Sequence, residues 1–233
     1  MKPLERLGIR KRLSWSIRRG HSVQFSGSYE TWEAALADST GYDTAVILER
    51  TREALLKVRN GAAAFERDSV LFAEQDYPFP IVAAMLREAL ASEGHLSVID
   101  FGGSLGSSYF QCRKFFPAFK TFRWNVIEQP AHVACGRRDF ETAQLRFHET
   151  IEQCLASKPE ANAVLLSGVL PYLRDPHLDF ENLLGLDIRT VIVDRTAFLP
   201  GDDDRLTVER VPAEIYHASY PFWFLSETKF LAR

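Results

Sequence analysis

The chain has 233 residues, a formal net charge of −3, 46% hydrophobic residues and 25% charged residues. These values are ordinary for a globular protein with one large core, and they give no general attraction to nucleic acid. No apolar run is long enough for a secretory signal or a membrane span. We therefore expect a cytoplasmic protein that binds no nucleic acid.

Residues 1–26 form a basic N-terminal arm. Within residues 1–19, seven lysines and arginines stand against one glutamate, a local charge of +6. Apolar residues such as Leu13 and Trp15 lie between the charges, so the arm could contact an anionic membrane surface weakly. The alternative interpretation is a solvated N-terminal segment.

The three cysteines, Cys112, Cys135 and Cys154, lie far apart and show neither CxxC nor CxxxH spacing. This pattern predicts neither a metal site nor a disulfide framework. Free buried thiols in a reducing cytoplasm are the expectation.

Residues 27–94 have helical periodicity and are predicted to form a helical cap. Asp43 suits the N-cap of the longest helix and Gly61 its C-terminal end. Pro78 suits the first turn of the last helix, whose apolar face is predicted to include Met85 and Leu90. The predicted helices cover residues 29–37, 44–60 and 78–93.

Residues 95–233 alternate between short apolar runs and helix-length connectors. Such runs predict strands buried on both faces of a parallel sheet, joined by right-handed crossovers. We therefore expect an α/β, Rossmann-like domain in this part of the chain. The predicted strands cover residues 96–101, 124–129, 145–149, 163–168 and 190–195.

A glycine-rich loop follows the first predicted strand, in the segment Val98–Phe110, VIDFGGSLGSSYF. Glycines allow a sharp turn and a close approach of a ligand to the backbone. The following helix, expected over residues 107–116, would direct its N-terminal amides to the same place. The candidate ligand-binding residues of this loop are Asp100, Phe101, Gly102, Gly103, Ser104 and Gly106.

Glu128 ends the second predicted strand, and its carboxylate could accept hydrogen bonds from the two hydroxyls of a ribose. A glycine loop and an acid in these positions together indicate an adenosine-containing ligand. A dinucleotide fingerprint would require glycine at Phe101, so a nicotinamide cofactor is disfavoured. The pattern acid-x-G-x-G-x-G of class I methyltransferases fits better, with Ser104 as its one departure.

Several segments together resemble a family of largely uncharacterised bacterial methyltransferases, often associated with surface-polysaccharide loci. The resemblance extends from about residue 27 to the end of the chain. It implies a class I fold, S-adenosylmethionine as cofactor, and a small or saccharide-like acceptor. The segments are YETWEAAL, SGYD, AAFERDSVLF, VIDFGGSLGSSYFQCR, VIEQP, LLSGVLPYLRDP, VIVDRT and VPAEIYHASYPFWFLS.

The resemblance also implies roles for residues at the ends of the strands. Gln129 would lie beside the adenine. His148 and Glu149 follow the third strand, where such enzymes often contact the adenine, although His148 could equally be an ordinary histidine at a strand end. Ser167 and Gly168 would lie under the methionine part of the cofactor. Tyr172 follows closely and could equally be a packing aromatic.

No residue is assigned as the catalytic base, because methyl transfer mainly requires alignment of the reactants. Other polar residues could face an acceptor, although ordinary ion pairs or solvated loops are equally good interpretations of them. These residues are Asp194, Arg195, Tyr216, His217 and the cap cluster of Glu66, Arg67 and Asp68.

The end of the chain departs from the class I pattern. Residues 225–233 are predicted to form the helix after strand five, so the last two strands of the sheet would be missing. Either the domain is truncated, with an exposed flank that favours dimerisation, or residues 205–211 take an edge position. The oligomeric state is left open.

Three hypotheses follow from the sequence. The leading one is an S-adenosylmethionine-dependent methyltransferase. The others are a catalytically degenerate binding or scaffold protein of the same fold, and an NAD-dependent oxidoreductase.

Overall fold

The computed structural model describes residues 23–41, 44–212 and 218–233. Asp43, Tyr216, His217 and most of the basic arm therefore lie outside the described residues. None of the helices in the described part is long and apolar enough to cross a membrane.

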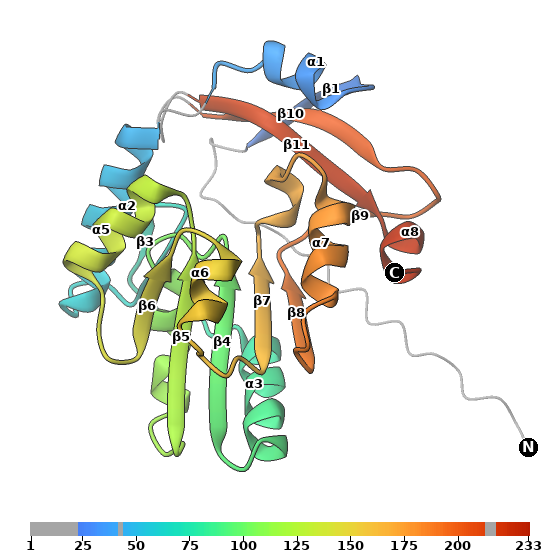
Figure 1. Ribbon diagram of the computed structural model, residues 1–233. Coiled ribbons are helices and arrows are strands. Elements are labelled where there is room, and N and C mark those ends of the chain that lie inside the picture. The colour runs from blue at the N-terminus through green and yellow to red at the C-terminus, as the bar shows by residue number, and fades with distance from the viewer. Residues whose placement is uncertain (1–22, 42–43, 213–217) are drawn as a thin grey trace, which may run out of the picture.

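The centre of the fold is a sheet of five parallel strands in the order β6-β5-β4-β7-β8. Each strand coincides with one of the predicted apolar runs, and the Rossmann-like architecture is confirmed. In Figure 1 these strands stand side by side and the helices flank them. The strands are β4 (His95–Phe101), β5 (Thr121–Ile127), β6 (Leu145–His148), β7 (Ala163–Ser167) and β8 (Thr190–Asp194).

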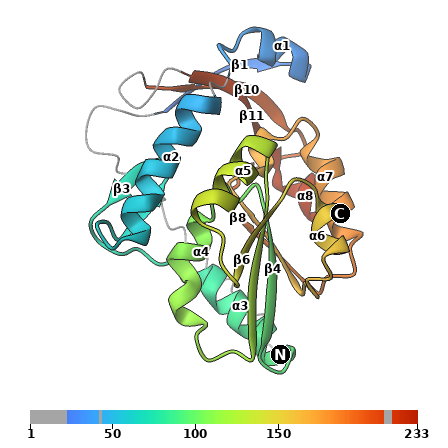
Figure 2. The same ribbon diagram turned by 60° about the vertical axis from the view of Figure 1, so that its left-hand side comes forward.

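Alternate residues of each strand point to opposite faces and build two separate hydrophobic cores. On β4, Val98 faces α3 (Phe79–Ala91) and α4 (Ser107–Cys112), whereas Ile99 faces α6 (Ile151–Ala156) and α7 (Pro176–Leu184). Figure 2 shows α4 and α6 on opposite sides of the sheet. Helix α5 (Pro130–Asp139) and two 3-10 turns, η1 (Arg113–Phe115) and η2 (Leu170–Tyr172), complete the connections.

The N-terminal part of the chain contains the predicted helices as α1 (Trp32–Ala37), α2 (Thr44–Arg59) and α3. It also contains strands that helical periodicity did not predict. They are β1 (Gln24–Tyr29) and the hairpin of β2 (Phe65–Arg67) and β3 (Val70–Phe72). Helices α2 and α3 share one core with β4 and β5, and the division of the chain at residue 94 stays a prediction.

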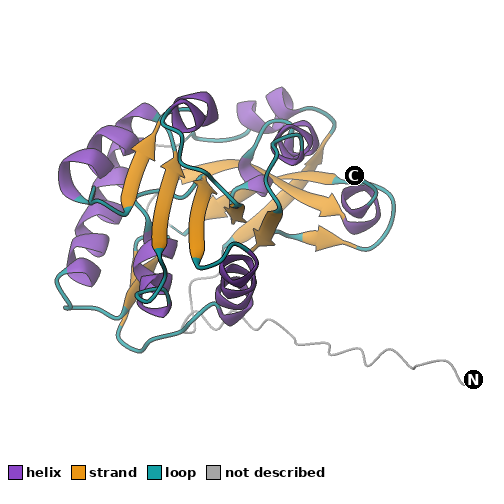
Figure 3. Ribbon diagram, turned by 60° about the horizontal axis from the view of Figure 1, so that its bottom comes forward, coloured by secondary structure: helices purple, strands orange, loops and turns teal. Residues whose placement is uncertain are grey.

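A second sheet has the order β1-β10-β11-β9 and joins the two ends of the described chain. Its other strands are β9 (Phe198–Leu199), β10 (Arg205–Val211) and β11 (Ala218–Ser226). In Figure 1 this sheet crosses above the carboxyl ends of the parallel strands, and Figure 3 shows the two sets of strands together.

The prediction of a helix over residues 225–233 is wrong in extent. Strand β11 continues to Ser226, and α8 covers only Glu227–Leu231. Contacts between distant segments explain the difference, because Leu225 and Ser226 pair with β9 and the preceding residues pair with β10. Residues 205–211 do form a strand, but it lies in the second sheet and not at the edge of the parallel one.

Candidate functional site

The glycine-rich loop begins at the carboxyl end of β4, where the strand order reverses between β4 and β7. Ligands of open α/β sheets bind at such switch points. The amide of Gly102 donates to the carbonyl of Ile127 at 2.9 Å, which joins the loop to β5. The amide of Gly106 donates to the carbonyl of Gly103 at 2.9 Å and closes a turn before α4.

Three loop residues have left-handed backbone conformations, with φ of 70° at Gly102, 54° at Ser104 and 93° at Gly106. Serine at 104 accepts this conformation at some cost, whereas the two glycines adopt it freely. A Cβ on Gly102 would also lie 2.3 Å from Cγ2 of Val169, which follows β7. The loop is therefore packed tightly against the neighbouring strand end.

Asp100, the acid of the motif, is buried at 1% exposure. Its Oδ2 accepts a hydrogen bond of 2.8 Å from the indole Nε1 of Trp124 on β5. Burial raises the pKa of Asp100 to about 7, although the Trp124 hydrogen bond and the charge of Arg195 lower it and Glu128 raises it. The side chain of Asp100 is therefore part of the support of the loop. Its role as a direct ligand contact stays a prediction.

Glu128 and His148 lie side by side at the ends of β5 and β6, because the amide of Glu128 donates to the carbonyl of His148 at 3.1 Å. Oε2 of Glu128 accepts a 2.7 Å hydrogen bond from the amide of Gln129, whose side chain is exposed. Nε2 of His148 is buried without a hydrogen-bond partner among the described residues. Burial lowers the pKa of His148, which favours the neutral imidazole.

Arg195 covers the end of β7. Its Nε donates to Oγ of Ser167 at 3.2 Å and its Nη2 to the carbonyl of the same residue at 3.1 Å. Oγ of Ser167 in turn donates to Asp194 at 2.8 Å. A Cβ on Gly168 would lie 3.2 Å from Nη2 of Arg195. The predicted pair Asp194 and Arg195 thus lies against the predicted residues Ser167 and Gly168.

The β2–β3 hairpin brings the predicted cap cluster to the same place. Glu66 is buried, and its carboxylate accepts hydrogen bonds from the hydroxyl of Ser107 in the first turn of α4 and from the amide of Ser69. Burial raises the pKa of Glu66 to about 7. Asp68 lies 3.8 Å from Nη1 of Arg195, so the hairpin contacts residues at the ends of both β4 and β8.

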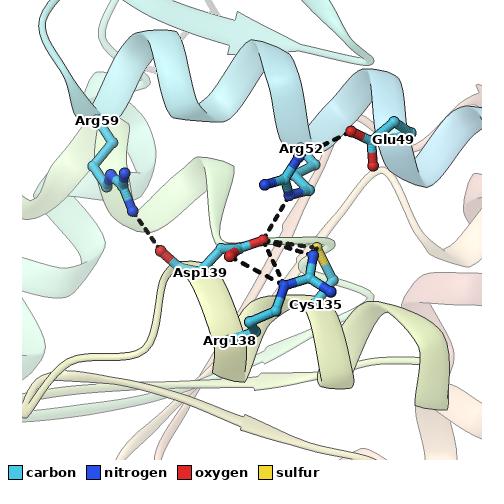
Figure 4. A network of polar contacts seen from close by, with 6 residues as sticks. All are labelled: Glu49, Arg52, Arg59, Cys135, Arg138 and Asp139. Atoms are coloured by element: carbon cyan, nitrogen blue, oxygen red, sulfur yellow. Dashed lines mark hydrogen bonds and ion pairs between the residues drawn. The ribbon is translucent and has the colours of Figure 1, made fainter.

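Helix α2, which precedes this hairpin, is fixed to α5 by a polar network (Figure 4). Oδ2 of Asp139 accepts hydrogen bonds from Arg52 at 2.6 Å and from Arg138 at 2.8 Å. Arg59 donates to the carbonyl oxygen of Asp139. The side-chain hydrogen bonds from Arg138 and Arg52 hold the pKa of Asp139 well below its usual range. The network fixes the position of the chain segment that carries Glu66.

Sequence reasoning missed Glu209 of β10. It is 6% exposed, and its Oε2 accepts a 2.8 Å hydrogen bond from the hydroxyl of Tyr172. Burial raises the pKa of Glu209 to about 7, the Tyr172 hydrogen bond lowers it, and the charge of Asp68 raises it. No motif in residues 205–211 marks Glu209 as a site residue, because the contact with Tyr172 comes from a segment far away in the sequence.

The comparisons with known proteins give two structural neighbours. No family model matches the chain, and no curated protein matches it. One neighbour is the N-terminal domain of EvdMO1 crystallised with SAH and D-fucose, with 16% identity and a TM-score of 0.44, covering 82% of this chain and 84% of that one. The same domain with SAH bound gives 15% identity and a TM-score of 0.43, covering 82% and 85%.

Proposed function

We propose that the chain binds S-adenosylmethionine and transfers its methyl group to a small or saccharide-like acceptor. One observation carries this proposal. The left-handed loop from Gly102 to Gly106 lies at the switch point of the sheet, with Glu128 at the end of the adjacent strand. Such a cofactor requires a loop whose backbone can approach a charged ligand closely. It also requires an acidic side chain that accepts hydrogen bonds from the ribose hydroxyls.

The residues present fit this cofactor. The loop residues Gly102–Gly106 would hold its methionine and ribose parts, and Glu128 would accept hydrogen bonds from the ribose hydroxyls. Gln129 and His148 would lie beside the adenine. Nε2 of His148 has no hydrogen-bond partner among the described residues, so it is a polar atom that a ligand could satisfy. Ser167 and Gly168 would lie near the methionine part.

S-adenosylmethionine supplies an activated methyl group on a sulfonium. The task of the chain is to hold an acceptor atom in line with that group, because alignment provides most of the rate acceleration in a displacement of this kind. The saccharide-like nature of the acceptor follows from the family resemblance.

Calorimetric titration of the full chain with S-adenosylmethionine, S-adenosylhomocysteine and NAD tests the proposal. We expect saturable binding of both S-adenosyl ligands and no heat with NAD. Binding of NAD alone would instead favour an oxidoreductase. Methyl transfer is then measured with methyl-labelled cofactor and a panel of monosaccharides and nucleotide sugars. Saturable S-adenosyl binding without transfer to any of them would favour a scaffold protein of the same fold.

A further inference from the structure

One face of the second sheet is turned toward the carboxyl ends of the parallel strands. Alternation along β10 and β11 places Glu209 on the same face as its neighbour Tyr220, and Phe222 follows two residues later. Tyr172 of η2 packs on this face, with its ring centroid 5.4 Å from that of Tyr220 and 5.1 Å from that of Phe222. The face therefore combines a carboxylate with aromatic rings.

This face is connected to the proposed cofactor site through η2. Tyr172 lies a few residues beyond Ser167 and Gly168, and its hydroxyl donates to Glu209. The charge of Asp68, which lies close to Arg195, also acts on Glu209. The segment after β7 and the second sheet thus meet at the hydrogen bond between Tyr172 and Glu209.

Two aromatic rings on this face are only partly covered, whereas that of Phe222 is buried. Tyr172 is 41% exposed and Phe25 of β1 is 42% exposed, and the Phe25 ring lies 4.7 Å from that of Phe222. Glu209 itself is buried beside them. The partly exposed rings present an apolar surface, and the carboxylate of Glu209 lies within hydrogen-bonding distance of the hydroxyl of one of them, Tyr172.

We propose that Glu209 and Tyr172 form the acceptor-binding pair, and that the acceptor is a neutral saccharide. This inference rests on the proposed function. A saccharide ring has apolar C–H faces, which contact aromatic rings, and hydroxyl edges, which donate to a carboxylate. Asp68 is acidic, and Glu209 becomes negatively charged when it loses its proton, so a neutral ring is favoured over a phosphorylated or carboxylated one.

The test is saccharide binding, measured by saturation-transfer NMR and calorimetry on the full chain with and without saturating S-adenosylhomocysteine. The probes are D-fucose, D-galactose, D-glucose, D-mannose and D-glucuronate. We expect at least one neutral sugar to bind, with a dissociation constant raised roughly tenfold by Glu209→Gln and severalfold by Tyr172→Phe. D-glucuronate should bind more weakly than D-glucose.

Glu160→Gln and Tyr77→Phe are the matched controls, because they make the same chemical changes outside this face and should leave sugar binding unchanged. S-adenosylhomocysteine affinity should be unchanged in all four variants. If Glu209→Gln does not fold, as judged by circular dichroism, the sugar affinity of Tyr172→Phe provides the test of the inference.

Sugar binding that is unaffected by both substitutions would overturn the inference. It is also wrong if no neutral sugar binds, or if D-glucuronate binds best. Failure of S-adenosylhomocysteine to bind would contradict the proposed function instead, because sugar binding is also measured in its absence.

Discussion

The carboxylate of Asp100 lies directly against the backbone of Gly103, and a Cβ on residue 103 would come within 2.5 Å of Asp100 Cγ. Glycine at this position is therefore required by the protein itself, whatever the ligand. Asp100 and Gly103, the second glycine of the loop, act as one unit, in which the side chain at the strand end supports the loop that follows it.

Gly103→Ala should consequently destabilise the chain and weaken S-adenosyl ligand binding, because the new methyl group displaces the Asp100 carboxylate or the loop. A cost of about 1–3 kcal/mol is expected in urea denaturation, as for other overpacked sites. The Asp100→Ala background provides the control. The added cost of Gly103→Ala should be smaller there, and equal costs in both backgrounds would show that the contact with Asp100 is unimportant.

Glu128→Ala should weaken binding of S-adenosylmethionine and S-adenosylhomocysteine alike, since the ribose is common to both. The expected loss is roughly 1.5–3 kcal/mol if both ribose hydrogen bonds are charge-assisted. Calorimetry measures it, with Glu160→Ala as a control. Unchanged affinity would remove Glu128 from the cofactor site.

Glu66→Gln should alter the dependence of stability on pH. Burial raises the pKa of Glu66 to about 7 in the folded chain, above the usual 4.5, so between these values the native state retains a proton that the unfolded state has lost. This group therefore lowers the stability of the wild type as pH rises from 4.5 to 7, by up to about 3 kcal/mol.

The glutamine variant lacks this titration. Its free energy of unfolding relative to wild type should be higher at pH 8 than at pH 5, as measured by urea denaturation at both values. Stability curves that run parallel for the two proteins would contradict the burial of a proton on Glu66. Thermal unfolding at the same two pH values provides an independent check.

Asp139→Asn should loosen the attachment of α2 to α5. At pH 7 we expect a loss of about 1–3 kcal/mol in the free energy of unfolding, since charged hydrogen bonds from Arg52 and Arg138 are weakened. The pKa of Asp139 is lowered in the folded state, so this stabilisation is present above the unfolded pKa and disappears as pH falls below it. The difference in free energy of unfolding between the variant and the wild type, measured by urea denaturation, should therefore become smaller toward pH 3.

The pair of Glu141 and Arg146 supplies the comparison for Asp139. Half of the Arg146 side chain is exposed, at 51%, so Glu141→Gln should cost at most about 1 kcal/mol. An equal or larger effect of Glu141→Gln would mean that the network around Asp139 has no special role in holding the cap.

The central sheet could be predicted from the sequence because its strands are continuous apolar runs, and the glycine loop because its position after a buried strand is local information. Polar residues inside elements were harder to interpret. Leu90 was expected to face the core but is 82% exposed, whereas Glu88 on the same helix is buried. The carboxylate of Glu88 accepts a hydrogen bond from Thr190, a partner that no local pattern reveals.

Glu209 shows the same limit within the candidate site. In an isolated hairpin the side chain of Glu209 would be exposed to solvent. Burial comes from Tyr172, which belongs to a turn after β7, and from β1, the first described strand. Both contacts join segments far apart in the chain.

The pairing of β1 with β10 has a consequence for synthesis on the ribosome. Gln24 lies opposite Arg210, so the first described strand has no partner until residues near 210 have left the exit tunnel. The parallel sheet and its glycine loop can form earlier from residues 95–194. A nascent chain can thus form the proposed cofactor loop before the surface that is proposed to bind the acceptor. The loop and that surface come together only after β11 has been synthesised.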